Sequence, residues 1–316
     1  MTASSKDIVA LDDRHARGMA IMTAAMLMLP LMDVAGKWLA TVDQLSPGQI
    51  ALIRFLVQFA VLVPVIVLLR GFSGLYPRHL SSNLLRGALL GLASMIFFVA
   101  VKYMPVADAI AVFFVEPLIL TALSAVVLKE TVGWRRRIAV VIGFVGALIV
   151  IQPSYALFGA VSLLPLCTAL LFAFYLVLNK QLAIDDEPVV MQMVAGAGAS
   201  ITLGLIVLGG SLAGIEDMTP TMPLHAISWA LLISIGLISA GGHMMVIQAL
   251  RYAPASLLAP FQYFEIVTAA GLGLLIFGDF PTLSKWIGIA IIIGSGLYTY
   301  WRERELKHRE TVEVAD

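Results

Sequence analysis

Charge and cysteine are scarce in this chain. Only 13% of its 316 residues are charged, and it holds a single cysteine, Cys167. Soluble domains carry about 25% charged residues, so half that share indicates that lipid is the main solvent of this chain. One cysteine excludes a disulfide framework and a cysteine metal cluster. Because Cys167 lies in an apolar segment, we expect it to be a small core residue.

Catalytic and nucleotide-binding motifs are missing as well. No G-x-x-x-x-G-K-[ST] loop occurs, which excludes an ATP-driven pump module of that type. The five histidines form no H-E-x-x-H site, and no G-x-S-x-G nucleophile elbow is present. Outside short loop clusters there is no basic surface for nucleic acid. We therefore expect no catalytic residue, no metal, no cofactor and no nucleic-acid partner.

Long hydrophobic runs take up most of the sequence. A helix needs about 20 apolar residues to cross the bilayer core, and the runs lack the alternation of membrane barrel strands. The expected spans are 18–40, 48–70, 84–101, 107–128, 136–152, 157–178, 189–210, 226–250, 255–277 and 284–301. This pattern predicts an all-α membrane protein with ten transmembrane helices.

The positive residues predict the orientation. With a cytoplasmic N-terminus, sixteen of the 20 Lys and Arg residues fall on the inner side, Arg86 counted among them. Only Lys102 and Lys285 fall in outer loops, and the positive-inside rule favours this arrangement. Residues 1–17 and 302–316 are then cytoplasmic, and a bacterial inner (plasma) membrane is expected.

The chain also contains an internal repeat. VKYMPVADAIAVFFVEP, which ends at Pro117, aligns at an offset of 149 with LRYAPASLLAPFQYFEI, which ends at Ile266. The alignment pairs Glu116 with Glu265, and the same offset pairs Glu130 with Asp279. Two interior glutamates therefore occupy matching positions.

A second similarity extends the repeat. Residues 37–49 align with 180–192 at an offset of 143. The predicted domains are therefore 18–152 and 153–301, with five helices each. An odd number of helices per repeat places the two copies upside-down relative to each other, as in many transporters. The predicted fold is thus two inverted five-helix repeats.

This arrangement is similar to the drug/metabolite transporter superfamily, in particular its EamA-domain members. The closing patterns LKETVGWRRRIAVVIGFVGALIVI and IFGDFPTLSKWIGIAIIIGSGLY resemble that family, and the resemblance covers about residues 18–301. It implies a substrate cavity between the halves, cytoplasmic termini and no nucleotide hydrolysis. Members of the family carry amino acids, nucleotide sugars, polyamines, cofactors and drugs.

Glu116 and Glu265 are the leading site candidates. A charged side chain at a helix centre costs about 2.5–3.5 kcal/mol on insertion scales, so it seldom lies there without a use. Pro117 should kink the helix beside Glu116 and free a carbonyl. We expect these glutamates to bind substrate or a proton. The alternative is a structural pair with Lys37 or Arg54.

Three further charges lie in the outer halves of the first two spans. Asp33 and Lys37 are four residues apart, so they can pair on one helix face. With Arg54 they are expected to form a gate or a vestibule. The alternative is that Lys37 and Arg54 extend to the lipid headgroups. The five charged candidates sum to minus one, which suggests that one glutamate binds a proton during transport.

Several uncharged or weakly basic residues complete the predicted substrate- or proton-binding set. Tyr175 and Asn179 fall near the positions that align with Asp33 and Lys37 of the first half, and Gln262 and Tyr263 lie beside Glu265. His243 is included, although a lone histidine is more often a hydrogen-bonded core residue. The complete set is Asp33, Lys37, Arg54, Glu116, Tyr175, Asn179, His243, Gln262, Tyr263 and Glu265.

Other residues receive structural interpretations. Asp108, Glu130 and Asp279 lie close to helix starts, where a carboxylate favours the helix dipole. The small-residue pairs Gly87/Gly91 and Ala290/Gly294 predict close helix contacts.

The predicted function is secondary transport by alternating access. The cargo would be a small polar or amphipathic metabolite, such as an amino-acid, cofactor or nucleoside-like solute, with proton coupling. Two alternatives stay open: an intramembrane enzyme that uses Glu116 and Glu265 as an acid/base pair on lipid, and an assembly subunit without cargo. The expected partners are a small-molecule substrate and the lipid bilayer, with a homodimer left open.

Overall fold

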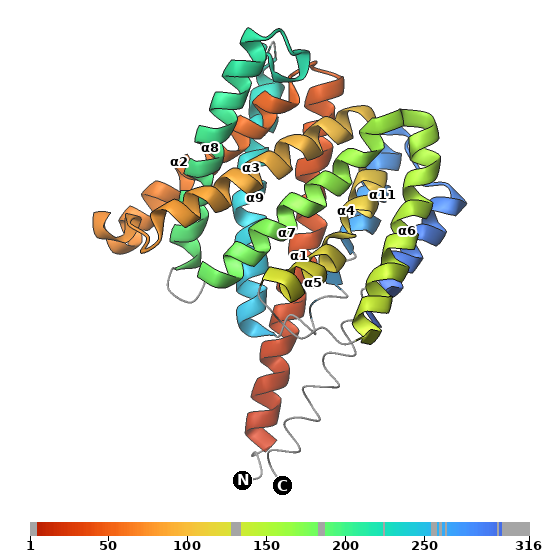
Figure 1. Cartoon of the computed structure of the whole chain (residues 1–316). Helices are drawn as coiled ribbons and strands as arrows, with labels where there is room; N and C mark the ends of the chain where they lie inside the picture. The colour runs from red at the N-terminus through yellow and green to blue at the C-terminus, as the bar shows by residue number, and fades with distance from the viewer. Residues whose placement is uncertain are drawn as a thin grey trace.

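The computed structural model describes residues 5–127, 134–182, 187–223, 225–253, 258, 261–262, 264–295 and 297–298. All regular structure within these ranges is helical (Figure 1). The α-helices are α1 (Ser5–Thr41), α2 (Pro47–Arg70), α3 (Leu80–Tyr103), α4 (Val106–Phe113), α5 (Glu116–Val127), α6 (Trp134–Phe158), α7 (Leu164–Leu182), α8 (Pro188–Leu212), α9 (Ala226–Tyr252) and α11 (Phe264–Phe277). Short 3₁₀ turns are η1 (Phe72–Leu75), η2 (Gly159–Leu163) and η3 (Glu216–Met218), and an apolar helix Leu283–Ser295 follows α11.

Among the residues that the structure describes, six helical stretches are long and apolar enough to cross a membrane. They are Arg14–Thr41, Pro47–Arg70, Leu80–Tyr103, Ser154–Asn179, Pro188–Leu212 and Ala226–Ala249. Three shorter apolar helices, Val141–Ile151, Phe264–Phe277 and Leu283–Ser295, lie where further spans are predicted. The all-α prediction for a membrane protein is confirmed.

The helices differ from the predicted spans in two places. The helix that contains the predicted span 18–40 is longer than the span, because α1 begins at Ser5 in a mixed-charge segment of good helix formers, while its apolar membrane-length stretch is Arg14–Thr41. The predicted span 107–128 is two helices, α4 and α5. The start of α2 at Pro47 is close to the predicted start at residue 48. Ser46 caps the helix, because its Oγ accepts a hydrogen bond from the Gln49 amide at 3.2 Å, and Pro47 occupies the first helical position.

The exterior of the bundle is apolar. Leu68, Leu275 and Leu205 are among the large hydrophobic side chains on its surface. Several charged side chains lie inside instead, including Asp33, Arg54 and Arg86. This distribution is the reverse of a soluble domain and suits lipid surroundings. Cys167 is exposed on α7, so its expected place in the core is wrong.

Small residues bring α3 and α8 together. A Cβ atom on Gly87 would collide with the backbone of Ala195, and one on Gly91 would lie 3.0 Å from the Ala199 Cβ. The predicted close contact at Gly87 and Gly91 is therefore confirmed.

The second small-residue prediction is wrong. No atom of the described part of the chain lies within 4 Å of a Cβ built on Gly294. Gly288, six residues earlier, instead packs against Gly146 and Val150 of α6. The last helix turns a different face to its neighbour than the spacing suggested.

Helices from the two halves of the chain pack directly against each other. The helix α1 lies along α9, α3 packs on α7 and α8, and α2 packs on α8 and α9 (Figure 1). Both α1 and α4 contact α11. We call the end with the 42–46 turn and the 213–223 and 278–282 segments the distal end. The opposite end, with the 71–79 loop, is the proximal end.

Candidate functional site

Arg54 lies at the centre of a buried polar cluster. It stands about two turns inside α2, and the residue is only 5% exposed. Its Nε donates to the Ser239 Oγ of α9 at 2.9 Å, and its Nη1 donates to the Ser94 Oγ of α3. Both bonds point into the bundle. The alternative in which Arg54 extends to the headgroups is therefore wrong.

Two carboxyl groups accompany Arg54. Asp33 of α1 is buried, and the positive charge of Arg54 attracts its carboxylate. Glu265, in the first turn of α11, is half-buried and close enough to Asp33 for the two acids to repel each other. The two acids and the guanidinium therefore belong to one electrostatic group, whereas the sequence grouped Asp33 and Arg54 with Lys37 and treated Glu265 separately.

Tyr175 and His243 complete this group. The Tyr175 side chain of α7 is buried and interacts electrostatically with Arg54. His243 also interacts electrostatically with Arg54, and its Nδ1 lies 2.8 Å from the Ser239 carbonyl oxygen. His243 is thus a hydrogen-bonded interior residue, which is the structural role that a lone histidine more often has. It also lies close to the Arg54 guanidinium. We call Asp33, Arg54, Tyr175, His243 and Glu265 the Arg54 cluster.

Both halves of the chain contribute to the Arg54 cluster. Its five members come from α1, α2, α7, α9 and α11. Formally, two carboxylates face one guanidinium, so the group has a charge of minus one when both acids are ionised. A small polar solute bound here would contact helices of both halves at once. Relative movement of the halves would then change its surroundings.

Glu116 lies apart from the Arg54 cluster. It is the first residue of α5, directly after a break at Phe114 and Val115. The predicted interruption beside Pro117 is therefore confirmed, since proline lacks the amide that would continue the helical bonds. Glu116 is 8% exposed, and its buried Oε1 has no hydrogen-bond partner among the residues that the structure describes.

The structural alternative for Glu116, a lock to Lys37 or Arg54, is wrong. Lys37 bonds to Asp279 and Arg54 bonds to two serine hydroxyls. Burying a carboxyl oxygen without a partner costs free energy, so this residue is not explained by assembly alone.

A run of aromatic rings connects the break beside Glu116 with Tyr175. Phe113 meets Phe97 edge-on at 6.2 Å and Phe172 at 5.4 Å between ring centroids. Phe172 in turn lies 5.2 Å from Tyr175. Such ring pairs stabilise the interior, and their faces are also suited to a flat solute.

Lys37 does not pair with Asp33, contrary to the prediction. Its Nζ lies 2.6 Å from the Oδ2 of Asp279. Asp279 follows α11 and is 242 positions away in sequence. The ammonium also lies over the Phe277 ring at 4.6 Å. Spacing along a helix permits a four-residue pair, but a better-placed acid on another element outcompetes it. Lys37 therefore belongs to the distal end rather than to the Arg54 cluster.

Asn179 and Arg86 form a second buried contact. Arg86 was counted as an inner topology charge, yet it is 2% exposed inside α3. It donates to the Asn179 Oδ1 at 2.6 Å and to the Met191 carbonyl, and its guanidinium lies 5.2 Å from the Tyr175 ring centroid. Asn179 is thus outside the Arg54 cluster, although Tyr175 borders both cations. The missed signal is that Arg86 falls inside the predicted span 84–101.

Gln262 and Tyr263 are the last two predicted site residues. Gln262 is half-buried and helical, whereas Tyr263 lies outside the described residues. Sequence reasoning missed Ser94, Ser239 and Gln58, because single serine and glutamine residues in apolar helices carry little signal. Gln58 is buried and donates to the Gln192 carbonyl at 3.0 Å.

Metal binding finds no support in the described ranges. Within them, no group of three or more His, Cys, Asp or Glu side chains lies close enough together to hold an ion.

Comparison with known proteins gives consistent results. The sequence model of the EamA-like transporter family matches residues 16–152 and again residues 159–301. A riboflavin transporter of Vibrio cholerae is 27% identical over 298 residues, which cover 94% of this chain and 97% of that protein. An S-adenosylmethionine uptake transporter of Rickettsia bellii is 28% identical over 273 residues, covering 86% and 89%. A riboflavin transporter of Brucella anthropi is 26% identical, covering 88% and 96%.

A solved crystal structure has the same overall fold. It superimposes with a TM-score of 0.62 at 20% sequence identity. The superposition covers 92% of this chain and 99% of the other.

Proposed function

Because this chain belongs to the EamA-like transporter family, we propose that it is a secondary transporter that moves a small polar or amphipathic metabolite by alternating access. The observation that carries the proposal is the Arg54 cluster, a buried polar site assembled from helices of both halves. The family match also removes the enzyme alternative, since the family and the relatives reported above are transporters.

The architecture proposed is ten transmembrane helices in two inverted repeats, 18–152 and 153–301. The excess of Lys and Arg on one side supports cytoplasmic termini. The distal end then faces the outside of a bacterial inner membrane, and the proximal end faces the cytoplasm. Alternating access would open the Arg54 cluster to each side in turn.

The cargo proposed contains a planar ring and polar groups. Relatives are named for riboflavin and for S-adenosylmethionine, and both compounds combine a nitrogen heterocycle with a polar chain. The aromatic run through Phe113 and Phe172 suits the ring, and Arg54 with Asp33 suits the polar part. A cofactor-like or nucleoside-like solute therefore fits better than a purely aliphatic one.

Proton coupling is part of the proposal and rests on Glu116. An ionised carboxylate without a buried partner is costly, whereas the neutral carboxyl is far less so. Glu116 would bind a proton in one conformation and release it in another. This site is separate from the substrate cluster, so coupling would pass through the movement of the interrupted α4–α5 segment.

Uptake into proteoliposomes tests the proposal. Radiolabelled riboflavin and S-adenosylmethionine are supplied outside, and the cargo recovered inside is analysed for chemical change. The Arg54→Ala variant should lower uptake about 10–150-fold, which corresponds to losing about 1.5–3 kcal/mol from a charged hydrogen bond.

The matched control is Arg251→Ala, since Arg251 is an exposed arginine at the end of α9. It should transport like the parent protein. Flux of neither compound, or of any related solute, by well-folded protein would favour the assembly-subunit alternative. Equal flux in the two variants would remove Arg54 from the site.

A further inference from the structure

Two ion pairs join the halves of the chain at the distal end. Lys37 of α1 pairs with Asp279 after α11, and Lys285 of the last helix pairs with Asp108 of α4. The first pair takes its cation from the first half of the chain, and the second takes its cation from the second half. The two bridges are therefore reciprocal.

These four charges form one network. Asp108 interacts electrostatically with Lys37 and Asp279 as well as with its direct partner Lys285. Two cations and two acids make it neutral overall. The side chains of Asp108, Lys285 and Lys37 are 1%, 6% and 10% exposed, whereas that of Asp279 is 30% exposed, so the network is withdrawn from solvent except at Asp279. We call Lys37, Asp108, Asp279 and Lys285 the distal ion network.

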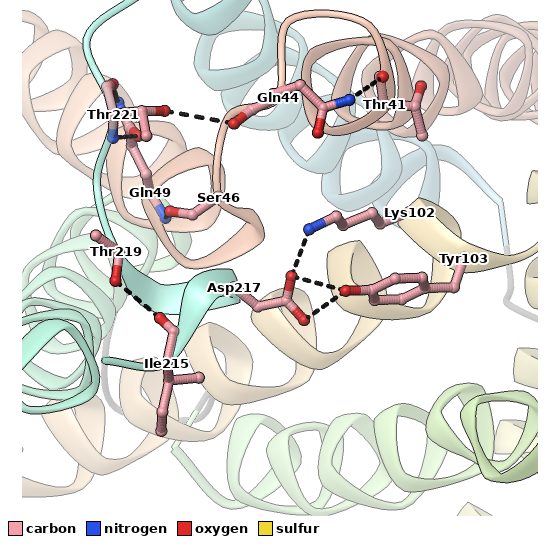
Figure 2. Close-up of polar contacts among 10 residues, drawn as sticks. All are labelled: Thr41, Gln44, Ser46, Gln49, Lys102, Tyr103, Ile215, Asp217, Thr219 and Thr221. Carbon is pink, nitrogen blue, oxygen red and sulfur yellow. Dashed lines mark hydrogen bonds and ion pairs between the residues drawn. The ribbon is translucent and has the colours of Figure 1, made fainter. Parts of the chain in front are cut away.

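Other distal contacts also cross between the halves, as Figure 2 shows. The Asp217 carboxylate accepts from the Lys102 Nζ at 2.6 Å and from the Tyr103 hydroxyl at 3.1 Å. The Gln49 side chain exchanges two hydrogen bonds with the Thr221 backbone, at 2.8 and 2.9 Å. The segment after α8 is thus fastened to α2 and α3. The distal ion network adds the corresponding connection for α1, α4, α11 and the last helix.

The position of the network relates it to the Arg54 cluster. Lys37 stands four residues distal to Asp33 on the same face of α1, which is about one helical turn or 6 Å. Asp33 belongs to the cluster and Lys37 to the network. A solute approaching from the distal side along this face would reach the ion pair before it reached Asp33.

Stability is a weak reason for such a network. Taking charges out of water costs about as much as their attraction returns, so a buried pair contributes little compared with a packed hydrophobic pair. Ion pairs are, however, suited to switching, because water solvates both partners well once they separate. Reciprocal pairs between two bodies therefore favour two discrete arrangements, one closed and one open.

We propose that the distal ion network is the outer gate of this transporter. In the conformation described, both pairs are formed and the distal ends of the two halves are closed over the Arg54 cluster. Both pairs separate when the cluster opens to the outside. This inference rests on the proposed alternating-access function and names the residues that close one side of it.

Thiol labelling tests the gate without any substrate. Ser239→Cys places a reporter beside Arg54, in a Cys167→Ser background that removes the exposed native thiol. A membrane-impermeant thiol reagent is added from outside to intact cells. The reporter alone should label slowly. Asp279→Asn and Lys285→Met should each raise the labelling rate on the order of tenfold, a typical shift between two conformations.

Charge reversal supplies the specific control. The double variant Lys37→Asp with Asp279→Lys exchanges the two charges and should restore slow labelling. Unchanged labelling in Asp279→Asn, or no restoration in the reversed pair, would overturn the gate. Failure of the proposed function would look different, because labelling would still switch although no tested compound crossed the membrane.

A cross-link keeps the test decisive if a single variant folds poorly. Lys37→Cys with Asp279→Cys, again without Cys167, is joined by a short bifunctional thiol reagent. Joined protein should lose uptake, and cleavage of the reagent by reductant should restore it. Uptake that continues with the cross-link in place would refute the gate.

Discussion

Replacing Arg54 with methionine removes the guanidinium of the Arg54 cluster and leaves Asp33 and Glu265 facing each other. The structure shows what is lost: two hydrogen bonds from the guanidinium, to Ser239 and Ser94, and its attraction to Asp33. Removing one partner from a buried charged group costs about 3–5 kcal/mol, because the remaining charge is uncompensated. We expect Arg54→Met to destabilise the protein by about 3 kcal/mol, the lower end of that range.

The compensating change is Asp33→Asn. In the parent protein this substitution should also destabilise, because it removes an acid that balances Arg54. In the Arg54→Met background it should instead stabilise, since it removes an uncompensated acid beside Glu265. The two substitutions therefore should not be additive, with a coupling free energy of at least about 1 kcal/mol.

The assay is thermal unfolding of four purified proteins in one detergent: the parent protein, the two single variants and the double variant. Each is measured with and without riboflavin or S-adenosylmethionine. A ligand at about 100 times its Kd stabilises by about 2.7 kcal/mol, and this increment should vanish in both Arg54→Met proteins. Additive unfolding free energies would refute the electrostatic reasoning. A full ligand increment in Arg54→Met would refute the binding role.

Three further predictions follow from other parts of the molecule. Glu116→Gln should leave ligand stabilisation intact while the pH dependence of proteoliposome uptake disappears; unchanged pH dependence would exclude Glu116 as the proton site. Gly87→Val should lower the free energy of unfolding by about 2 kcal/mol or more, seen as a lower melting temperature, because the new side chain meets the Ala195 backbone, whereas Gly294→Ala should change it little. The internal repeat aligns Lys37 with Lys180 and Asp279 with Glu130, and the structure describes the side chain of neither Lys180 nor Glu130. If Lys180 and Glu130 pair on the cytoplasmic side when the protein opens to the outside, Glu130→Gln should disfavour that outward-open conformation. Added to Asp279→Asn, it should return the Ser239→Cys reporter to slow labelling, and continued fast labelling would contradict this pairing.

Part of the candidate site could be predicted from the sequence. Asp33, Arg54 and Glu265 could be predicted because a charged side chain in an apolar helix is a strong local signal, whereas Tyr175 came from the internal repeat and His243 was a weaker candidate. The break at Glu116 could be predicted as well, since the adjacent proline lacks an amide hydrogen whatever surrounds it. These predictions needed no knowledge of neighbouring helices.

Other parts could not be predicted. Arg86 was assigned to the membrane surface by a counting rule that does not consider which way a side chain points. Helical spacing predicted that Lys37 could pair with Asp33, four residues away, but its partner is Asp279, which follows α11. Helical spacing shows which residues can meet on one helix, but it contains no information about another helix that offers a better partner.

The sequence alone determined that this is an all-helical membrane protein, where most of its helices lie, and which polar residues are enclosed by apolar ones. These are consequences of local hydrophobicity, which needs only neighbours along the chain. The tertiary structure alone decided that Arg54 meets serines of α3 and α9, that Arg86 meets Asn179, and that the halves are joined by two reciprocal ion pairs at one end. Charges choose partners by distance in space, and that distance is set by how the helices pack.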